Sequence, residues 1–160
     1  MVTQSAQETQ KLGEKIGNQL IISHPASPAG RQPSIIALYG ELGSGKTTFI
    51  QGLAKGLGIK DRILSPTFVM IRQYSITNHQ LLVTGHQSPI TNFFHVDLYR
   101  VENEKDVESL GLEEIWSDPQ NIVAIEWAEK IKKILPKKRT DIHFKYANEN
   151  ERRIRINFKS

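Results

Sequence analysis

Apolar side chains recur at helical spacing near the start of the chain. Leu12, Ile16 and Leu20 lie four residues apart, and polar residues such as Glu14 and Lys15 occupy the other side. A period close to 3.6 residues is typical of an amphipathic helix that packs one face on a core. The pattern predicts an opening helix over about residues 5–20. The loop expected next, over 23–34, contains three prolines and one glycine.

Short unbroken apolar runs predict strands that are covered on both faces. The run at 35–39 is followed at once by glycines, and a helical period returns after Lys46 and lasts until Gly58, which is placed to cap the helix. Two further runs, 93–96 and 122–125, each end in a carboxylate, Asp97 and Glu126 respectively. Buried strands that end in acids indicate a catalytic edge of the sheet.

The segments between these runs predict shorter elements. Residues 67–75 are expected to be extended, and the polar stretch 77–92 to be a hairpin-like insertion. Residues 104–116 predict two helical pieces broken at Gly111, and residues 127–135 predict a helix that ends before a proline.

The tail alternates apolar and polar residues over 140–146 and 152–158, on either side of an Asn148-Glu149-Asn150 turn, which predicts a hairpin. Strands and helices alternate through the rest of the chain. The sequence therefore predicts one α/β domain over residues 1–160, with a largely parallel central sheet and a C-terminal antiparallel hairpin.

Residues 40–47 satisfy the pattern G-x-x-x-x-G-K-[ST] between a predicted strand and a predicted helix. A nucleotide phosphate needs several converging N–H donors, and glycines allow the backbone to wrap closely around it at a helix N-terminus. Lys46 is suited to neutralise β- and γ-phosphate charge, and the Thr47 hydroxyl to occupy one place around Mg²⁺. The predicted phosphate-binding residues are Gly40, Glu41, Leu42, Gly43, Ser44, Gly45, Lys46, Thr47 and Thr48.

The nucleotide is expected to be ATP. GTP-binding proteins of this class usually read guanine with an Asn-Lys-x-Asp segment, and the chain has none, because Asn103-Glu104-Lys105-Asp106 is out of register.

Asp97 and Glu126 are candidates for holding Mg²⁺ and orienting water, because phosphoryl transfer relies on positioning and charge neutralisation. Alone, an acid after an apolar run more often faces solvent, but a neighbouring phosphate loop favours a function. Physical reasoning leaves open which of the two ligates the metal. Thr67 lies either in a loop that senses the γ-phosphate or in an ordinary turn. His95 shares a strand face with Asp97, and a structural role is the commoner one for a lone histidine.

Composition excludes several classes of protein and kinds of site. The chain of 160 residues has no cysteine, which excludes a disulfide framework, a thiolate nucleophile and a Cys-ligated zinc site. Its start lacks a signal-peptide pattern and no apolar run approaches the ~20 residues of a membrane span, so a cytoplasmic protein is expected. The net charge is +4. Two basic groups are either solvated surface or a footprint for RNA or an acidic protein. They are Lys130, Lys132, Lys133, Lys137, Lys138 and Arg139, and Arg152, Arg153 and Arg155.

Four motifs occur together in order along the chain. They are the phosphate loop with Thr48, Ser65-Pro66-Thr67-Phe68, His95-Val96-Asp97-Leu98-Tyr99-Arg100 and Ile125-Glu126-Trp127. The set resembles the TsaE family, also called YjeE, the ATPase of bacterial tRNA threonylcarbamoyladenosine biosynthesis. The likeness spans nearly the whole chain. The phosphate loop is common to many NTPases, whereas the combination is highly specific.

The resemblance implies a P-loop NTPase-like three-layer fold. It also implies an ATPase that is slow by itself and that acts with TsaB and TsaD. Those partners modify the adenosine next to the tRNA anticodon, so this chain is expected to contact tRNA indirectly, through the complex. The chain alone is expected to be a monomer. By motif, the catalytic residues are Lys46, Asp97 and Glu126, the metal ligands are Thr47 and Glu126, and Thr67 and Trp127 lie beside the nucleotide.

Two other functions can use the same loop. A small-molecule kinase usually carries an Arg-bearing lid, and residues 101–121 between the two acidic strands contain no Arg. A binding module whose ATP occupancy gates assembly would bind the nucleotide without releasing phosphate.

Overall fold

The computed structural model describes residues 1–23, 33–76, 90–102 and 105–159. Its elements in chain order are β1 (Val2–Thr3), α1 (Ala6–Ser23), β2 (Ser34–Tyr39), α2 (Lys46–Gly56), β3 (Ile71–Ser75), β4 (Asn92–Asp97), α4 (Lys105–Glu108), α5 (Leu112–Ser117), β5 (Asn121–Glu126), the 3₁₀ helix η1 (Ala128–Ile131), β6 (Arg139–Tyr146) and β7 (Arg152–Lys159).

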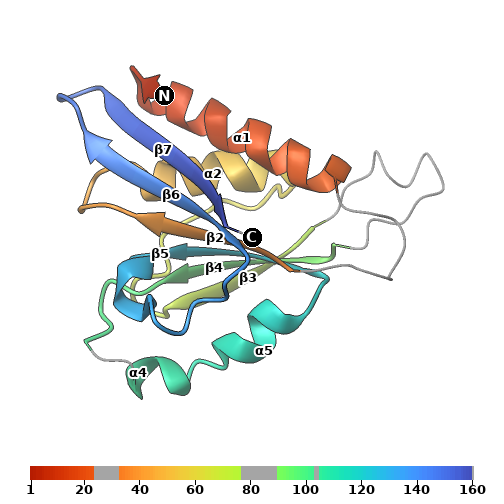
Figure 1. Ribbon diagram of the computed structural model, residues 1–160. Helices are drawn as coiled ribbons and strands as arrows, with labels where there is room; N and C mark the ends of the chain where they lie inside the picture. The colour runs from red at the N-terminus through yellow and green to blue at the C-terminus, as the bar shows by residue number, and fades with distance from the viewer. Residues whose placement is uncertain (24–32, 77–89, 103–104, 160) are drawn as a thin grey trace.

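The strands form one seven-stranded sheet in the order β1-β7-β6-β2-β5-β4-β3. The four central strands β6, β2, β5 and β4 run parallel, and β3, β7 and β1 are added antiparallel at the two sides. Figure 1 shows α1 and α2 on one side of the sheet, and α4 and α5 on the other side, beside β3, β4 and β5. The α/β class with a largely parallel centre and a C-terminal hairpin is confirmed.

The unbroken apolar runs arise because β2 and β5 are buried on both faces. Ile36 and Leu38 of β2 belong to the hydrophobic cluster under α1 and α2, whereas Ile35 and Ala37 belong to the cluster under α5 and η1. Alternate residues of one strand point to opposite faces, so a strand between two cores needs apolar residues at every position. The carboxyl ends of these parallel strands meet at one edge of the sheet, where Asp97 is registered with Glu126.

Helix α1 packs on α2 through glycines on both helices. A Cβ atom built on Gly52 would lie 1.9 Å from the backbone oxygen of Gln10, and one on Gly13 would lie 2.2 Å from the backbone oxygen of Phe49. A Cβ atom on Gly17 or Gly56 would also lie within 2.4 Å of a backbone oxygen of the other helix. The two backbones therefore touch directly, and α2, whose first residue is Lys46, is fixed against a long helix.

Two predicted elements are shorter than the sequence pattern indicated. Residues 67–70 are not extended, because the carbonyl of Pro66 accepts the N–H groups of Val69 and Met70 at 2.9 and 2.6 Å and closes a turn before β3. The helix expected over 127–135 is reduced to η1, which begins after Trp127 at a φ of 61°.

Other local predictions are confirmed. Gly58 lies just beyond α2 with a φ of 81°, and Gly111 separates α4 from α5 with a φ of 62°. In the tail, the side-chain oxygen of Asn148 accepts the N–H groups of Asn150 and Glu151 at 3.1 and 2.9 Å, which forms the turn between β6 and β7. The loop expected over 23–34 and the insertion over 77–92 fall largely outside the described residues.

Candidate functional site

The phosphate-loop motif lies between β2 and α2, at the edge where the parallel strands end. Gly40, Gly43 and Gly45 all have positive φ, at 142°, 73° and 102°. Side chains with a Cβ rarely adopt this region, so the loop depends on its glycines. Helix α2 begins directly after Gly45, which directs the positive end of the helix dipole toward this loop.

Lys46 is held inside the loop. Its ammonium donates hydrogen bonds to the carbonyls of Gly40 and Glu41 at 2.7 and 2.9 Å, and lies 4.0 Å from the centre of the Trp127 ring. Burial lowers the pKa of Lys46, and the neighbouring carboxylates of Glu126, Glu129 and Asp97 oppose this shift. A cation is thus kept close to the loop with little access to water.

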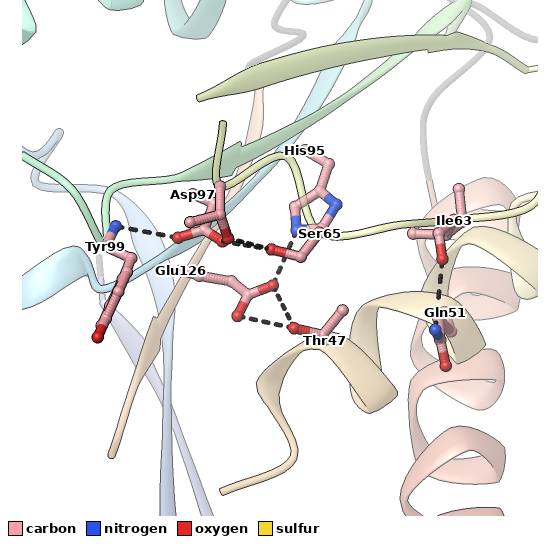
Figure 2. A network of polar contacts seen from close by, with 9 residues as sticks. Thr47, Gln51, Ile63, Ser65, His95, Asp97, Tyr99 and Glu126 are labelled. Carbon is pink, nitrogen blue, oxygen red and sulfur yellow. Dashed lines mark hydrogen bonds and ion pairs between the residues drawn. The ribbon is translucent and has the colours of Figure 1, made fainter. Parts of the chain in front are cut away.

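Glu126 connects the phosphate loop to β4 (Figure 2). The hydroxyl of Thr47 donates to both carboxylate oxygens of Glu126, at 2.8 and 3.0 Å, and Nε2 of His95 lies 2.9 Å from Oε1. His95 is fully buried, and Glu126 is 3% exposed. The carboxylate therefore has a fixed orientation, with a hydroxyl on one side and an imidazole on the other.

Asp97 has different partners. The hydroxyls of Ser65 and Thr67 donate to its Oδ2 at 2.5 and 2.6 Å, and the backbone N–H of Tyr99 donates to Oδ1 at 3.0 Å, as Figure 2 shows for Ser65 and Tyr99. The two hydroxyls also lie 2.7 Å apart. Asp97 thus joins the Ser-Pro-Thr-Phe segment to the end of β4, while Glu126 joins the phosphate loop to β5.

A cavity of about 380 Å³ opens where these groups meet. It is lined by Leu42, Gly43, Gly45, Lys46, Thr47, Thr48, Ser65, Thr67, Asp97, Tyr99, Glu126 and Trp127. The structure therefore brings together ten of the residues predicted from the sequence. The other three, Gly40, Glu41 and Ser44, line a separate hollow of about 400 Å³ beside β6.

Sequence reasoning missed several residues around the site. Ser65 and Tyr99 lie within two of the four family motifs, but no local pattern predicted their contacts with Asp97. Tyr146 and Arg152 come from the hairpin: the Tyr146 hydroxyl and the Arg152 guanidinium each donate to a phosphate-loop carbonyl at 3.5 Å. These contacts cross more than 100 residues of sequence, so no local pattern could reveal them.

The pairing of His95 with Glu126 predicts a coupled loss of stability. In a His95→Leu variant the buried carboxylate loses a partner, and we expect the free energy of unfolding to fall by about 1–3 kcal/mol. Nδ1 of His95 has no hydrogen-bond partner among the described residues, so Nε2 is the nitrogen whose loss matters. Urea denaturation of His95→Leu, Glu126→Gln and the double variant measures the coupling. Strictly additive losses would show that the contact contributes nothing.

The parallel sheet and the glycine loop at the end of its central strand define an α/β protein with a P-loop-like fold. Residues 3–154 match the family model described as "Threonylcarbamoyl adenosine biosynthesis protein TsaE". The chain belongs to the TsaE family.

Relatives and a solved structure agree with this assignment. The chain is 38% identical over 120 residues to the tRNA threonylcarbamoyladenosine biosynthesis protein TsaE of Bacillus subtilis, a match that spans 75% of this chain and 66%, just under two thirds, of the relative. It is 30% identical to the TsaE protein of Treponema pallidum over 97% of both chains. The crystal structure of Bacillus subtilis YdiB superposes with a TM-score of 0.69 at 28% identity, covering all of this chain and 84% of that one.

Among the described residues, no helix is both long and apolar enough to cross a membrane.

Proposed function

We propose that this chain is a Mg²⁺-dependent ATPase that works with TsaB and TsaD in the threonylcarbamoylation of the adenosine next to the tRNA anticodon. ATP binding and hydrolysis support repeated turnover of the transferase complex. Membership of the TsaE family and the names of its relatives support a role in this pathway. The arrangement of the site supports the chemistry.

The observation that carries the proposal is one cavity that holds a phosphate loop, a buried cation and two carboxylates with different partners. Lys46 neutralises phosphate charge from within the loop, and the glycine backbone wraps around the anion. The Trp127 ring covers the ammonium and limits its contact with water. These are positioning and electrostatic roles, which supply most of the catalysis in phosphoryl transfer.

The donor set fits Mg²⁺. Within the described ranges no group of three or more His, Cys, Asp or Glu side chains could hold a metal ion. Mg²⁺ does not need such a group, since it is commonly held by one or two protein oxygens together with phosphates and water. The Thr47 hydroxyl and the Glu126 carboxylate are hard oxygen ligands within hydrogen-bond distance of each other. When bound there, Mg²⁺ supplies charge neutralisation to the phosphates.

Asp97 is assigned a different task. Its carboxylate is held by Ser65, Thr67 and the backbone of Tyr99, and it faces the same cavity as Lys46 and Thr47. We assign to it the orientation of the attacking water, and to Thr67 the coupling of the Ser-Pro-Thr-Phe turn to that carboxylate. Glu126 therefore serves the metal and Asp97 serves the nucleophile.

Separate substitutions of the two acids test this division. We expect Glu126→Gln and Asp97→Asn each to lower kcat for ATP hydrolysis by about 100-fold, in the range typical of losing one positioned group. Only Glu126→Gln should also remove the enhancement of ADP affinity by Mg²⁺, because only Glu126 contacts Thr47. Calorimetric titration with ADP, with and without Mg²⁺, measures this difference. Normal turnover in both variants would refute the assignments.

Reconstitution tests the proposed function as a whole. Purified TsaB, TsaD and the adenylate-forming enzyme are combined with tRNA, with or without this chain, and modified tRNA is counted per complex. Multiple rounds that appear only when the chain is added support the proposal, and equal yields contradict it. Tight ATP binding without phosphate release would instead indicate a gating module, and transfer of labelled γ-phosphate to a metabolite would indicate a kinase.

A further inference from the structure

The two faces of the β6–β7 hairpin differ in character. Ile142, Phe144 and Ile154 point into the hydrophobic cluster under α1 and α2, and Ile156 packs against that cluster. The second cluster, under α5 and η1, contains no residue of β6 or β7. Figure 1 shows α4 and α5 beside the other half of the sheet. In the described part of the chain, the outer face of the hairpin is therefore left without a helix over it.

The register places basic residues together on this outer face. Directly opposed residues of an antiparallel pair share a face, and alternate residues of a strand return to it. Three opposed pairs are Lys145 with Arg153, His143 with Arg155, and Arg139 with Lys159. We call these six residues the basic hairpin face. Lys145, Arg153, Arg155 and Lys159 are exposed.

The acidic residues near this face offset only part of its charge. Asp141, which shares the face, is buried and already paired, since Arg139 donates to its Oδ1 at 2.7 Å and the Tyr39 hydroxyl at 3.2 Å. Glu151 in the turn accepts a hydrogen bond from the Asn148 side chain at 2.7 Å. Glu41 and Lys145 both line the hollow beside β6. An excess of positive charge remains over the exposed part of the hairpin.

A flat aromatic pair borders these cations. The rings of Tyr39 and His143 are stacked with their centres 4.5 Å apart and an angle of 12° between planes. Tyr39 is the last residue of β2 and directly precedes the phosphate loop. The stacked pair thus connects the basic hairpin face to the end of β2, next to the start of the phosphate loop.

We propose that the basic hairpin face binds RNA directly, through its phosphate backbone. Nucleic acids carry one negative charge per nucleotide, and the guanidinium groups of Arg153 and Arg155 present donors in the fork that matches phosphate oxygens. Such binding is electrostatic and largely independent of base sequence. The stacked rings of Tyr39 and His143 offer a surface next to the cations for an unpaired base.

The composition of the face favours RNA over an acidic protein. The centre of a protein interface is typically depleted of charge and built on buried apolar anchors. Here the exposed side chains of the face are cationic, and one exposed apolar side chain, Val2, pairs with Arg153 across β1 and β7. The exposed rings of Tyr146 and Phe158 occupy alternate positions of the hairpin and do not share this face. This RNA binding does not depend on ATP hydrolysis. It adds a direct RNA contact to a proposed function in which the chain otherwise acts on tRNA only through partner proteins.

Charge-matched double variants test the proposal. Arg153→Gln with Arg155→Gln removes two cations from the face, and Lys11→Gln with Lys15→Gln removes two exposed cations from the outer side of α1. The probe is a fluorescein-labelled, unmodified tRNA transcript, followed by anisotropy over a range of salt concentrations. We expect the arginine variant to bind at least about fivefold more weakly and the lysine variant within about twofold of wild type. The slope of log K against log salt should fall by about two for the arginine variant.

The controls separate this proposal from the others. Thermal unfolding and ATP hydrolysis without RNA should match wild type in both double variants, because neither pair lines the nucleotide cavity. Equal weakening in both variants, or none in either, overturns the proposal, as does binding of a polyglutamate peptide through the same arginines when tRNA fails to bind. Absence of phosphate release by wild type contradicts the proposed ATPase function and leaves the RNA result intact.

Discussion

Replacement of Lys46 by alanine is expected to weaken ATP binding by about 100-fold, equivalent to about 2.8 kcal/mol, and to abolish phosphate release. The Lys46 ammonium is the buried cation of the phosphate loop, and it is already desolvated and positioned by the carbonyls of Gly40 and Glu41. A phosphate that enters the cavity therefore meets a preorganised charge. Calorimetric titration with Mg-ATP and a steady-state phosphate assay measure the two effects.

Lys55→Ala is the matched control for this experiment. Lys55 lies on the same helix and pairs with Glu14 at 3.0 Å, but its side chain is 72% exposed. An exposed pair of this kind contributes at most about 1 kcal/mol to stability and lies outside the cavity. Unchanged nucleotide affinity in Lys46→Ala would show that the loop does not hold the phosphates.

The second large effect concerns stability. In an exposed helix, Gly→Ala usually stabilises by about 0.5–1 kcal/mol, because alanine restricts the unfolded chain. At Gly52 the sign should reverse, since the new Cβ would lie 1.9 Å from the backbone oxygen of Gln10. The two helices would have to separate, and we expect Gly52→Ala to lower the free energy of unfolding by about 3 kcal/mol.

Urea denaturation of Gly52→Ala, with Lys55→Ala as the control on the same helix, measures this cost. The control should stay within about 1 kcal/mol of wild type. A Gly52→Ala variant as stable as wild type would contradict the direct backbone contact between α1 and α2.

Much of the fold could be predicted because its signals are local. The strands β2 and β5 are buried on both faces, so each is an unbroken apolar run, and α1 shows the period of a helix with one buried face. Asp97 and Glu126 could be expected to meet because parallel strands bring their carboxyl ends to one edge. The phosphate-loop motif predicted the positions of Lys46 and Thr47 because all its residues are contiguous in sequence.

The remainder depends on contacts between distant segments. The different roles proposed for Asp97 and Glu126 rest on their hydrogen-bond partners. Asp97 accepts from Ser65 and Thr67, whereas Glu126 contacts Thr47 and His95, and these partners lie about 30 to 80 residues away in sequence. The turn at 67–70 escaped prediction because apolar residues such as Phe68, which is exposed, gave the segment the composition of a strand.

Local patterns could not tell the two tryptophans apart, and only the family motif placed Trp127 beside the nucleotide. Trp116 is 6% exposed and packs in the cluster under α5 and η1. Trp127 instead leaves β5 at a positive φ and turns its ring toward the Lys46 ammonium. The difference is one of backbone conformation, which hydrophobic patterning along the chain does not reveal.

Asp97 and Glu126 occupy registered positions on adjacent strands. Their backbones are therefore separated by the hydrogen-bonded spacing of the sheet, about 4.8 Å. Strand pairing thus fixes the separation of the two acidic residues, and this separation does not depend on the lengths of the connecting segments. Insertions or deletions in the sequence between β3 and β4 therefore leave the spacing of the two acids unchanged.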